Sequence, residues 1–166
     1  MTLSQFFTKL KNILTAPLPV GGLEISATSL KFLLVKNQTI LQASLRLPAG
    51  IIVHGEVKDQ KSLVLALKNL HIQISPIGKP LTVILNIPSS IPFTQSFSVP
   101  LIEPEHLEES IKLNLQMISP NKIEDSYYDW QEIKTNKDLG HIELLGAFSN
   151  AKAVDALTSC AQEANF

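Results

Sequence analysis

The hydrophobic pattern of the first half of the chain contains three strand-like runs, which predict three β-strands, and hydrophobic and polar residues alternate along ILQASLRL in the third. The three runs are residues 20–25, 30–35 and 39–47, and the polar turn KNQT joins the last two. A helix is expected over 60–70, because its leucines recur at helical spacing and Asp59 is a favourable N-cap. The pattern predicts an antiparallel meander with a helix against it.

The second half predicts the order strand, strand, helix, strand, strand, helix. The strands are LTVILNIP, FTQSFSV, residues 126–133 and residues 141–148; the helices begin near Pro104 and after Asn150. Glutamates in the first turn of the helix near Pro104 would face the positive end of its dipole. This order is typical of an α+β unit with helices packed against one antiparallel sheet.

Residues 3–14, LSQFFTKLKNIL, place six apolar side chains at helical spacing. The following APLPVGG ends the predicted helix. Such a segment could cover the protein's own core, dock on a partner or rest on a membrane surface. Its two lysines attract anionic lipid only weakly, so its own core or a partner is favoured.

Composition narrows the class of protein. The chain has 166 residues, of which 45% are hydrophobic and 17% charged, as in a globular protein of one domain or two small ones. No apolar run approaches the roughly 18 residues of a membrane-spanning helix, and no signal peptide is predicted. Cys160 is the single cysteine, which excludes an internal disulfide and favours a reducing compartment. One arginine and no basic stripe disfavour nucleic-acid binding, and four scattered histidines disfavour a zinc site.

Charge is distributed unevenly along the chain. Residues 1–80 carry nine basic and three acidic side chains, whereas residues 81–166 carry five basic and twelve acidic ones. Two solvated faces would explain this distribution. The alternative is a bipolar particle whose halves, or successive copies, attract each other and support a homo-oligomer.

Candidate chemistry is confined to one loop. No serine lies in a G-x-S-x-G elbow, and Asp125, Asp129 and Glu132 are interpreted as surface charge because no sheltered pocket is predicted around them. The stretch GLEISATSLKFLLV contains small residues, hydroxyls and a following lysine, as in an anion-holding turn. A tight hairpin prefers the same residue types, so the residues alone leave both interpretations open. The candidate phosphate-binding residues are Glu24, Ser26, Ala27, Thr28, Ser29 and Lys31.

The same stretch resembles the first phosphate loop of actin-like ATPases, and is most similar to the PilM family of type IV pilus assembly proteins. Three later segments resemble that family in the same order: LPAGIIVHGEVKDQKSLVLALKNL, the segment from LTVILNIP to SYYDWQEI, and HIELLGAFSNAKAVDALTSCAQEANF. The cell-division protein FtsA has the same architecture and is an alternative relative.

The resemblance implies an α+β fold in three parts. Residues 1–19 would be an amphipathic helix and linker, 20–79 a partial actin-like (RNase H-like) subdomain, and 80–166 a strand-helix-strand-strand (SHS2-type) subdomain. The strand over 20–25 would then be an unpaired sheet edge, open to β-addition or covered by the N-terminal helix.

Two departures from the family bear on nucleotide binding. Glu24 stands where the family usually has an aspartate that organises magnesium, and the chain ends before the segments that would supply the second lobe. We therefore expect a vestigial loop, no catalytic residues, no metal site and no cofactor in this chain alone. ATP with magnesium is expected only in a completed fold.

The resemblance implies a non-catalytic cytoplasmic scaffold at the inner membrane, only peripherally attached to it. PilM-like proteins bind the N-terminal tail of the inner-membrane protein PilN between their two subdomains. Here that groove would lie between the first sheet and the insert, with the acidic stretch Glu103–Glu109 as a candidate surface for a basic tail. The alternative is half of an actin-like ATPase, of the FtsA or a secretion-system type, which binds ATP when a second lobe is supplied.

Overall fold

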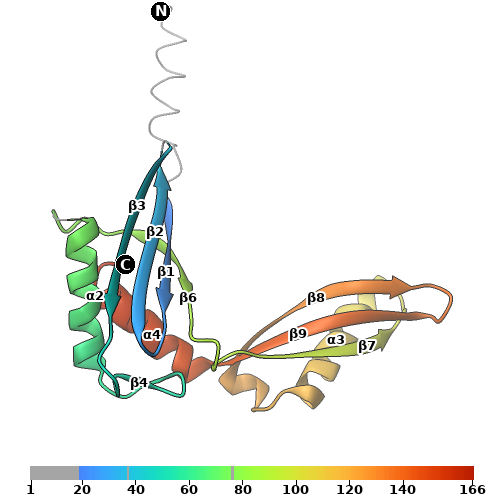
Figure 1. Cartoon of the computed structure of the whole chain (residues 1–166). Coiled ribbons are helices and arrows are strands. Elements are labelled where there is room, and N and C mark those ends of the chain that lie inside the picture. The colour runs from blue at the N-terminus through green and yellow to red at the C-terminus, as the bar shows by residue number, and fades with distance from the viewer. Residues whose placement is uncertain (1–18, 37, 76) are drawn as a thin grey trace, which may run out of the picture.

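The computed structural model describes residues 19–36, 38–75 and 77–166, and the helix predicted over 3–14 lies outside them. The first sheet has four strands in the order β3-β2-β1-β6 (Figure 1). Their bounds are β1 Val20–Ile25, β2 Ser29–Lys36, β3 Thr39–Arg46 and β6 Thr82–Asn86. β1, β2 and β3 form the antiparallel meander predicted from the sequence, whereas β6 runs parallel to β1.

Two helices cover one face of this sheet. They are α2 (Gln60–Ile74) and α4 (Ala151–Glu163). Leu63, Leu67 and Leu70 of α2 are buried against Leu23, Ile25 and other inner-face residues of the strands. The Asp59 side chain accepts a hydrogen bond from the Ser62 backbone N–H at 3.0 Å, so the predicted N-cap is confirmed. A short hairpin leads from the sheet into α2. Its strands, β4 (Ile52–Val53) and β5 (Glu56–Val57), have two residues each.

The second sheet is antiparallel and has the order β7-β9-β8. Its elements are β7 Phe93–Pro100, α3 Pro104–Ile118, the short 3-10 helix η1 Ile123–Asp125, β8 Ser126–Asn136 and β9 His141–Asn150. Ile111 and Leu115 of α3 are buried against Val99, Leu144 and Phe148 of the sheet. We call residues 93–150 the insert; it extends to one side of the first sheet (Figure 1).

Two expectations about the boundary are corrected by this topology. β1 is not an unpaired edge, because Val20–Glu24 pair with Thr82–Asn86. Consequently the first strand after residue 80 belongs to the first sheet. The last helix also leaves the insert, since Leu157, Cys160 and Ala161 of α4 are buried in the first core. The insert therefore contains three strands, one α-helix and the short η1, not the four strands and two helices expected of the second half.

Among the described residues, the two sheets are joined at one place. Residues 87–92 lead into β7, and β9 returns beside β7, where Phe148 is opposite Phe93. Asn150 is both the last residue of β9 and the N-cap of α4, because its side chain accepts a hydrogen bond from the Ala153 N–H at 3.0 Å. No helix among the described residues is long and apolar enough to cross a membrane.

Candidate functional site

The predicted phosphate loop is the connection between β1 and β2. Ser26 closes it: its backbone N–H donates to the Ser29 carbonyl at 2.9 Å, and its hydroxyl accepts from the Ser29 N–H at 3.0 Å. The hydroxyl also lies 3.0 Å from the carbonyl and from the Oγ of Ser29. The Thr28 carbonyl accepts from the Leu47 N–H at 2.8 Å. The serine hydroxyls thus satisfy each other within the turn, as in a hairpin.

The two charged candidates lie on adjacent strands. Glu24 and Lys31 are cross-strand partners, and the Lys31 ammonium is 2.8 Å from a Glu24 carboxylate oxygen. The pair is exposed to solvent, so its attraction is strongly screened. An incoming phosphate would compete with Glu24 for Lys31, whereas a magnesium ion would compete with Lys31 for Glu24.

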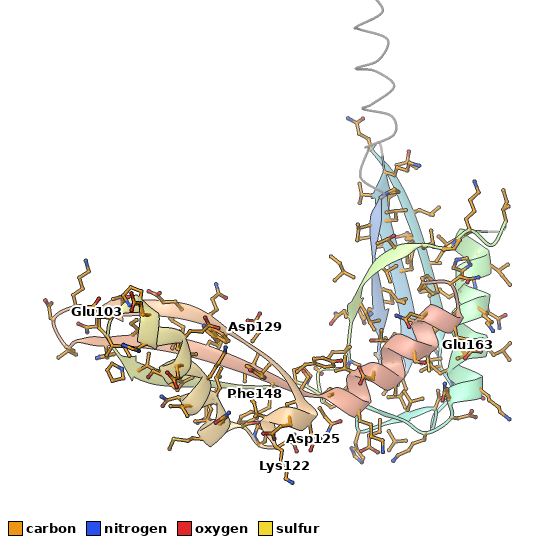
Figure 2. The ribbon with its side chains drawn as sticks, turned by 180° about the vertical axis from the view of Figure 1, so that it is seen from behind. Glu103, Lys122, Asp125, Asp129, Phe148 and Glu163 are labelled. Atoms are coloured by element: carbon orange, nitrogen blue, oxygen red, sulfur yellow. The ribbon has the colours of Figure 1, made fainter. Side chains whose placement is uncertain are left out.

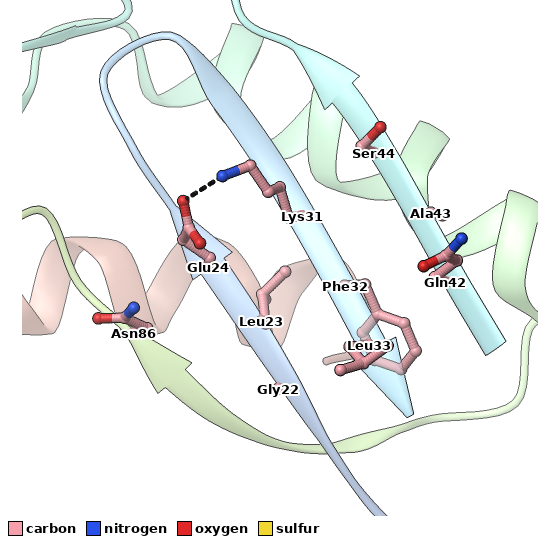
Figure 3. Close-up of a pocket in the computed structure, with 10 residues that line it drawn as sticks. All are labelled: Gly22, Leu23, Glu24, Lys31, Phe32, Leu33, Gln42, Ala43, Ser44 and Asn86. Carbon is pink, nitrogen blue, oxygen red and sulfur yellow. Dashed lines mark hydrogen bonds and ion pairs between the residues drawn. The ribbon is translucent and has the colours of Figure 1, made fainter. Parts of the chain in front are cut away.

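A shallow hollow of about 640 Å³ lies beside this pair, on the sheet face opposite the helices (Figure 3). Gly22 is exposed at its floor, and a side chain added there would meet nothing closer than 4.0 Å. Lys31, Leu33 and Gln42 lie along one side, and Glu24 and Asn86 along another. The hollow is polar toward the β1–β2 turn and apolar toward the start of β1.

Asn86 is the residue that the sequence analysis missed. It ends β6 and is opposite Glu24, so the polar row runs across all four strands as Asn86, Glu24, Lys31 and Ser44. A polar residue at the end of the apolar run LTVIL was the available signal. Its neighbour could not be identified, because the pairing of β6 with β1 joins segments about sixty residues apart.

A second hollow, of about 430 Å³, lies where the insert joins the first sheet; we call it the junction groove. It is lined by the β4–β5 hairpin, by Ser90 and Ile91, and by the start of α4. Val57, Ile91, Ala153 and Ala156 supply apolar surface. His54, Glu56, Lys58 and Lys152 supply charged or titratable groups.

Charge in the junction groove is partly compensated. Lys58 lies within hydrogen-bonding distance of Glu56 and lowers the pKa of that carboxyl, with smaller contributions from Lys152 and His54. Gly55 fixes the hairpin against the connection to the insert. Its φ is +82°, and a Cβ there would lie 2.5 Å from the Ile91 side chain.

The acidic stretch Glu103–Glu109 does not line this groove. Glu103 lies at the end of the insert away from the first sheet (Figure 2). Glu108 pairs with Lys112 at 2.8 Å within α3, and this contact lowers its pKa. The expectation that this stretch meets a tail between the two parts is therefore wrong.

Asp125 and Asp129 are exposed, and Figure 2 shows them apart along the insert. Among the described residues, no group of three or more His, Cys, Asp or Glu side chains is arranged to hold a metal ion.

Comparison with known proteins yields structural matches only. No protein-family model and no curated protein sequence matches the chain. A solved structure of a "PilM-PilN type IV pilus biogenesis complex" superposes with a TM-score of 0.73 at 19% identity, over 90% of this chain and 45% of that one. The cytoplasmic domain of EpsL, an inner-membrane component of the type II secretion system of Vibrio cholerae, matches with a TM-score of 0.48 at 13% identity, over 85% and 52%.

The likeness to the PilM structure, with its TM-score of 0.73, establishes the fold. The predicted α+β class and the partial actin-like first part are confirmed by the mixed sheet and by the PilM likeness. The chain spans about half the length of the solved structures that it matches.

Proposed function

We propose that this chain is a non-catalytic scaffold of a type IV pilus or related secretion machine, and that it binds the N-terminal tail of a PilN-type inner-membrane protein. The observation that carries the proposal is the superposition on PilM from a PilM–PilN complex over 90% of the chain. The proposed setting is the cytoplasmic side of the inner membrane.

The proposed binding place is the junction groove. Its apolar surface is open to an aliphatic side chain of a tail, and its exposed lysines are close enough to contact polar groups beside it. Two elements of the first part and the entry to the insert meet there, so one bound segment would contact both parts. Binding sites are commonly placed at such boundaries.

A peptide titration tests this proposal. A fluorescent peptide with the sequence of the tail of the PilN-type protein from the same genome should bind the full chain with a saturable change in anisotropy. Lys152→Glu reverses a charge in the groove, and Ala153→Trp fills its apolar surface, so both should weaken binding at least about tenfold.

Lys36→Glu is the matched control, because Lys36 is exposed on β2, away from the groove. It should leave the affinity unchanged. Equal losses in Lys36→Glu and Lys152→Glu would indicate general electrostatic attraction and would count against the groove.

The absence of ATPase activity in this chain alone is also part of the proposal. Ser26 is engaged within its own turn and Lys31 is paired with Glu24, so a phosphate would have to displace existing contacts. Calorimetry with ATP and magnesium should give flat heats. Micromolar affinity that is lost in Ser26→Ala/Thr28→Ala would instead support the half-ATPase alternative.

A further inference from the structure

The outer face of the first sheet is the face opposite α2 and α4. One half of this face carries the polar row, and the other half carries exposed apolar side chains. We call the apolar half the outer patch. It consists of Val20, Leu33, Val35, Ile40 and Ile84. Val35 and Ile40 are each 62% exposed and Ile84 is 72% exposed, and these residues come from all four strands. Scattered exposed hydrophobic residues are ordinary, but a contiguous set on one sheet face usually marks a contact surface.

The outer patch has a gap between its exposed side chains. Gly22 is flanked by Ile84 on β6 and Leu33 on β2, so a position without a side chain lies between two exposed aliphatic ones. Gly22 and Leu33 also line the apolar end of the hollow in Figure 3. A large apolar side chain from a covering element would fit over Gly22 and contact both neighbours.

We propose that residues 3–14 of this chain occupy the outer patch as an amphipathic helix. Residues 1–18 lie outside the described part and are connected through Pro19 to Val20, which begins β1 and belongs to the patch. The segment carries six apolar side chains at helical spacing, Leu3, Phe6, Phe7, Leu10, Ile13 and Leu14. A twelve-residue helix is about 18 Å long, and an eight-residue strand is about 26 Å long, so the helix fits within the length of the sheet.

The connecting residues permit this placement. Residues 15–19, TAPLP, separate the predicted helix from β1. Five residues span at most about 17 Å, which exceeds the roughly 10 Å between packed layers. Docking would convert the two-layer arrangement of sheet and helices into three layers.

Cysteine cross-linking in the full chain tests this inference directly. Phe7→Cys with Leu33→Cys should form an intramolecular disulfide under mild oxidation. Phe7→Cys with Leu65→Cys is the matched control, because Leu65 on α2 is 61% exposed on the other side of the same sheet. If residues 3–14 dock on the outer patch, position 7 should cross-link to position 33 at least about tenfold faster than to position 65. This ratio corresponds to about 1.4 kcal/mol of preference. The natural Cys160 is buried and does not compete for oxidation.

Each other outcome would overturn the inference. Equal cross-linking rates at positions 33 and 65 would show that residues 3–14 do not dock on the outer patch. Cross-links that form only between chains, and slow on dilution, would assign the patch to a second copy. Loss of the 33 cross-link on adding vesicles that contain anionic lipid would assign the segment to a membrane surface.

A second measurement does not depend on cross-linking. Phe6→Asp/Phe7→Asp should increase binding of the dye ANS to the full chain several-fold, because the outer patch would be uncovered. Gln5→Asp/Thr8→Asp changes the predicted polar side and should leave dye binding unchanged. No increase in the first variant would contradict docking. These tests use no PilN-type peptide, so they can fail independently of the proposed function.

Discussion

The first sheet and the insert are built on cores of different size. Among the described residues, eighteen form the buried cluster of the first part and six form that of the insert, and no residue belongs to both. A core of six side chains supplies limited stabilisation to a unit of its own. We therefore expect the first part to contribute most of the free energy of folding. We also expect the attachment to the first part to stabilise the insert.

The largest expected effect is in the first core. Leu67→Ala removes a fully buried side chain from α2 and should lower the free energy of unfolding by about 2–5 kcal/mol, as measured by urea denaturation. Leu65→Ala, two residues away on the exposed side of the same helix, should change it by no more than about 0.5 kcal/mol. Similar losses in both variants would show that α2 is not packed as described.

A local effect is expected in the insert. Leu115→Ala also removes a fully buried side chain, so amide exchange in β7 and β9 should accelerate by an order of magnitude or more. Exchange in β1 and β2 should stay unchanged, because their core does not include Leu115. Equal acceleration in both sheets would show that the two cores unfold as one unit.

Gly146 provides a control for that variant. A Cβ at Gly146 would lie 2.9 Å from the Leu115 side chain, so Gly146→Ala alone should destabilise the insert. Combined with Leu115→Ala, the added methyl would face vacated space and its cost should diminish. Additive effects would place the two residues out of contact.

One hydrogen bond connects the insert to α4 and can be tested by a conservative substitution. The Tyr127 hydroxyl of β8 donates to an Asp155 carboxylate oxygen of α4 at 2.9 Å, and this contact raises the pKa of the tyrosine above its ordinary value. Asp155→Asn should return that pKa toward 10.0, measured by absorbance during alkaline titration. Since the neutral tyrosine is favoured in the folded state, any stability from this contact is lost as pH rises through the folded pKa. No change in the titration would show that the contact is not formed in solution.

The smallest effect concerns the start of α2. Hydrogen bonds from Ser62 lower the pKa of Asp59, so the capping contribution is present above its ordinary value of 3.8 and is lost as pH falls through the lower folded pKa. Asp59→Asn retains a capping oxygen without a charge and should flatten this part of the acid-unfolding curve. Asp59→Ala should lower the melting temperature at neutral pH as well. An unchanged curve in Asp59→Asn would indicate that other groups control unfolding by acid.

Sequence patterns predicted the local elements because their causes are local. The strand-like runs of β1 to β3, the Asp59 cap and the Asn150 cap depend on residues within a few positions of each other. The patterns do not show which sheet or which core each element joins. LTVILNIP predicts a buried strand without specifying which sheet it joins, whereas β6 is an edge strand of the first sheet with Ile84 exposed. A capped helix after Asn150 likewise does not indicate which core it covers.

The same distinction applies to the candidate site. The turn from Ser26 to Ser29 was identified correctly as a loop of small polar residues, but its role in binding stays a prediction. The position of Asn86 beside Glu24 and the location of the junction groove both depend on pairings between distant segments. No periodicity within either segment contains that information.

The adjacent entry and exit strands of the insert have an evolutionary consequence. Because the described chain leaves the first part and returns to it at neighbouring points, the insert resembles a side branch with one point of attachment. Replacing the branch by a short loop would preserve the path of the remaining polypeptide, so this module could be exchanged, enlarged or lost while the platform beneath it keeps its connectivity.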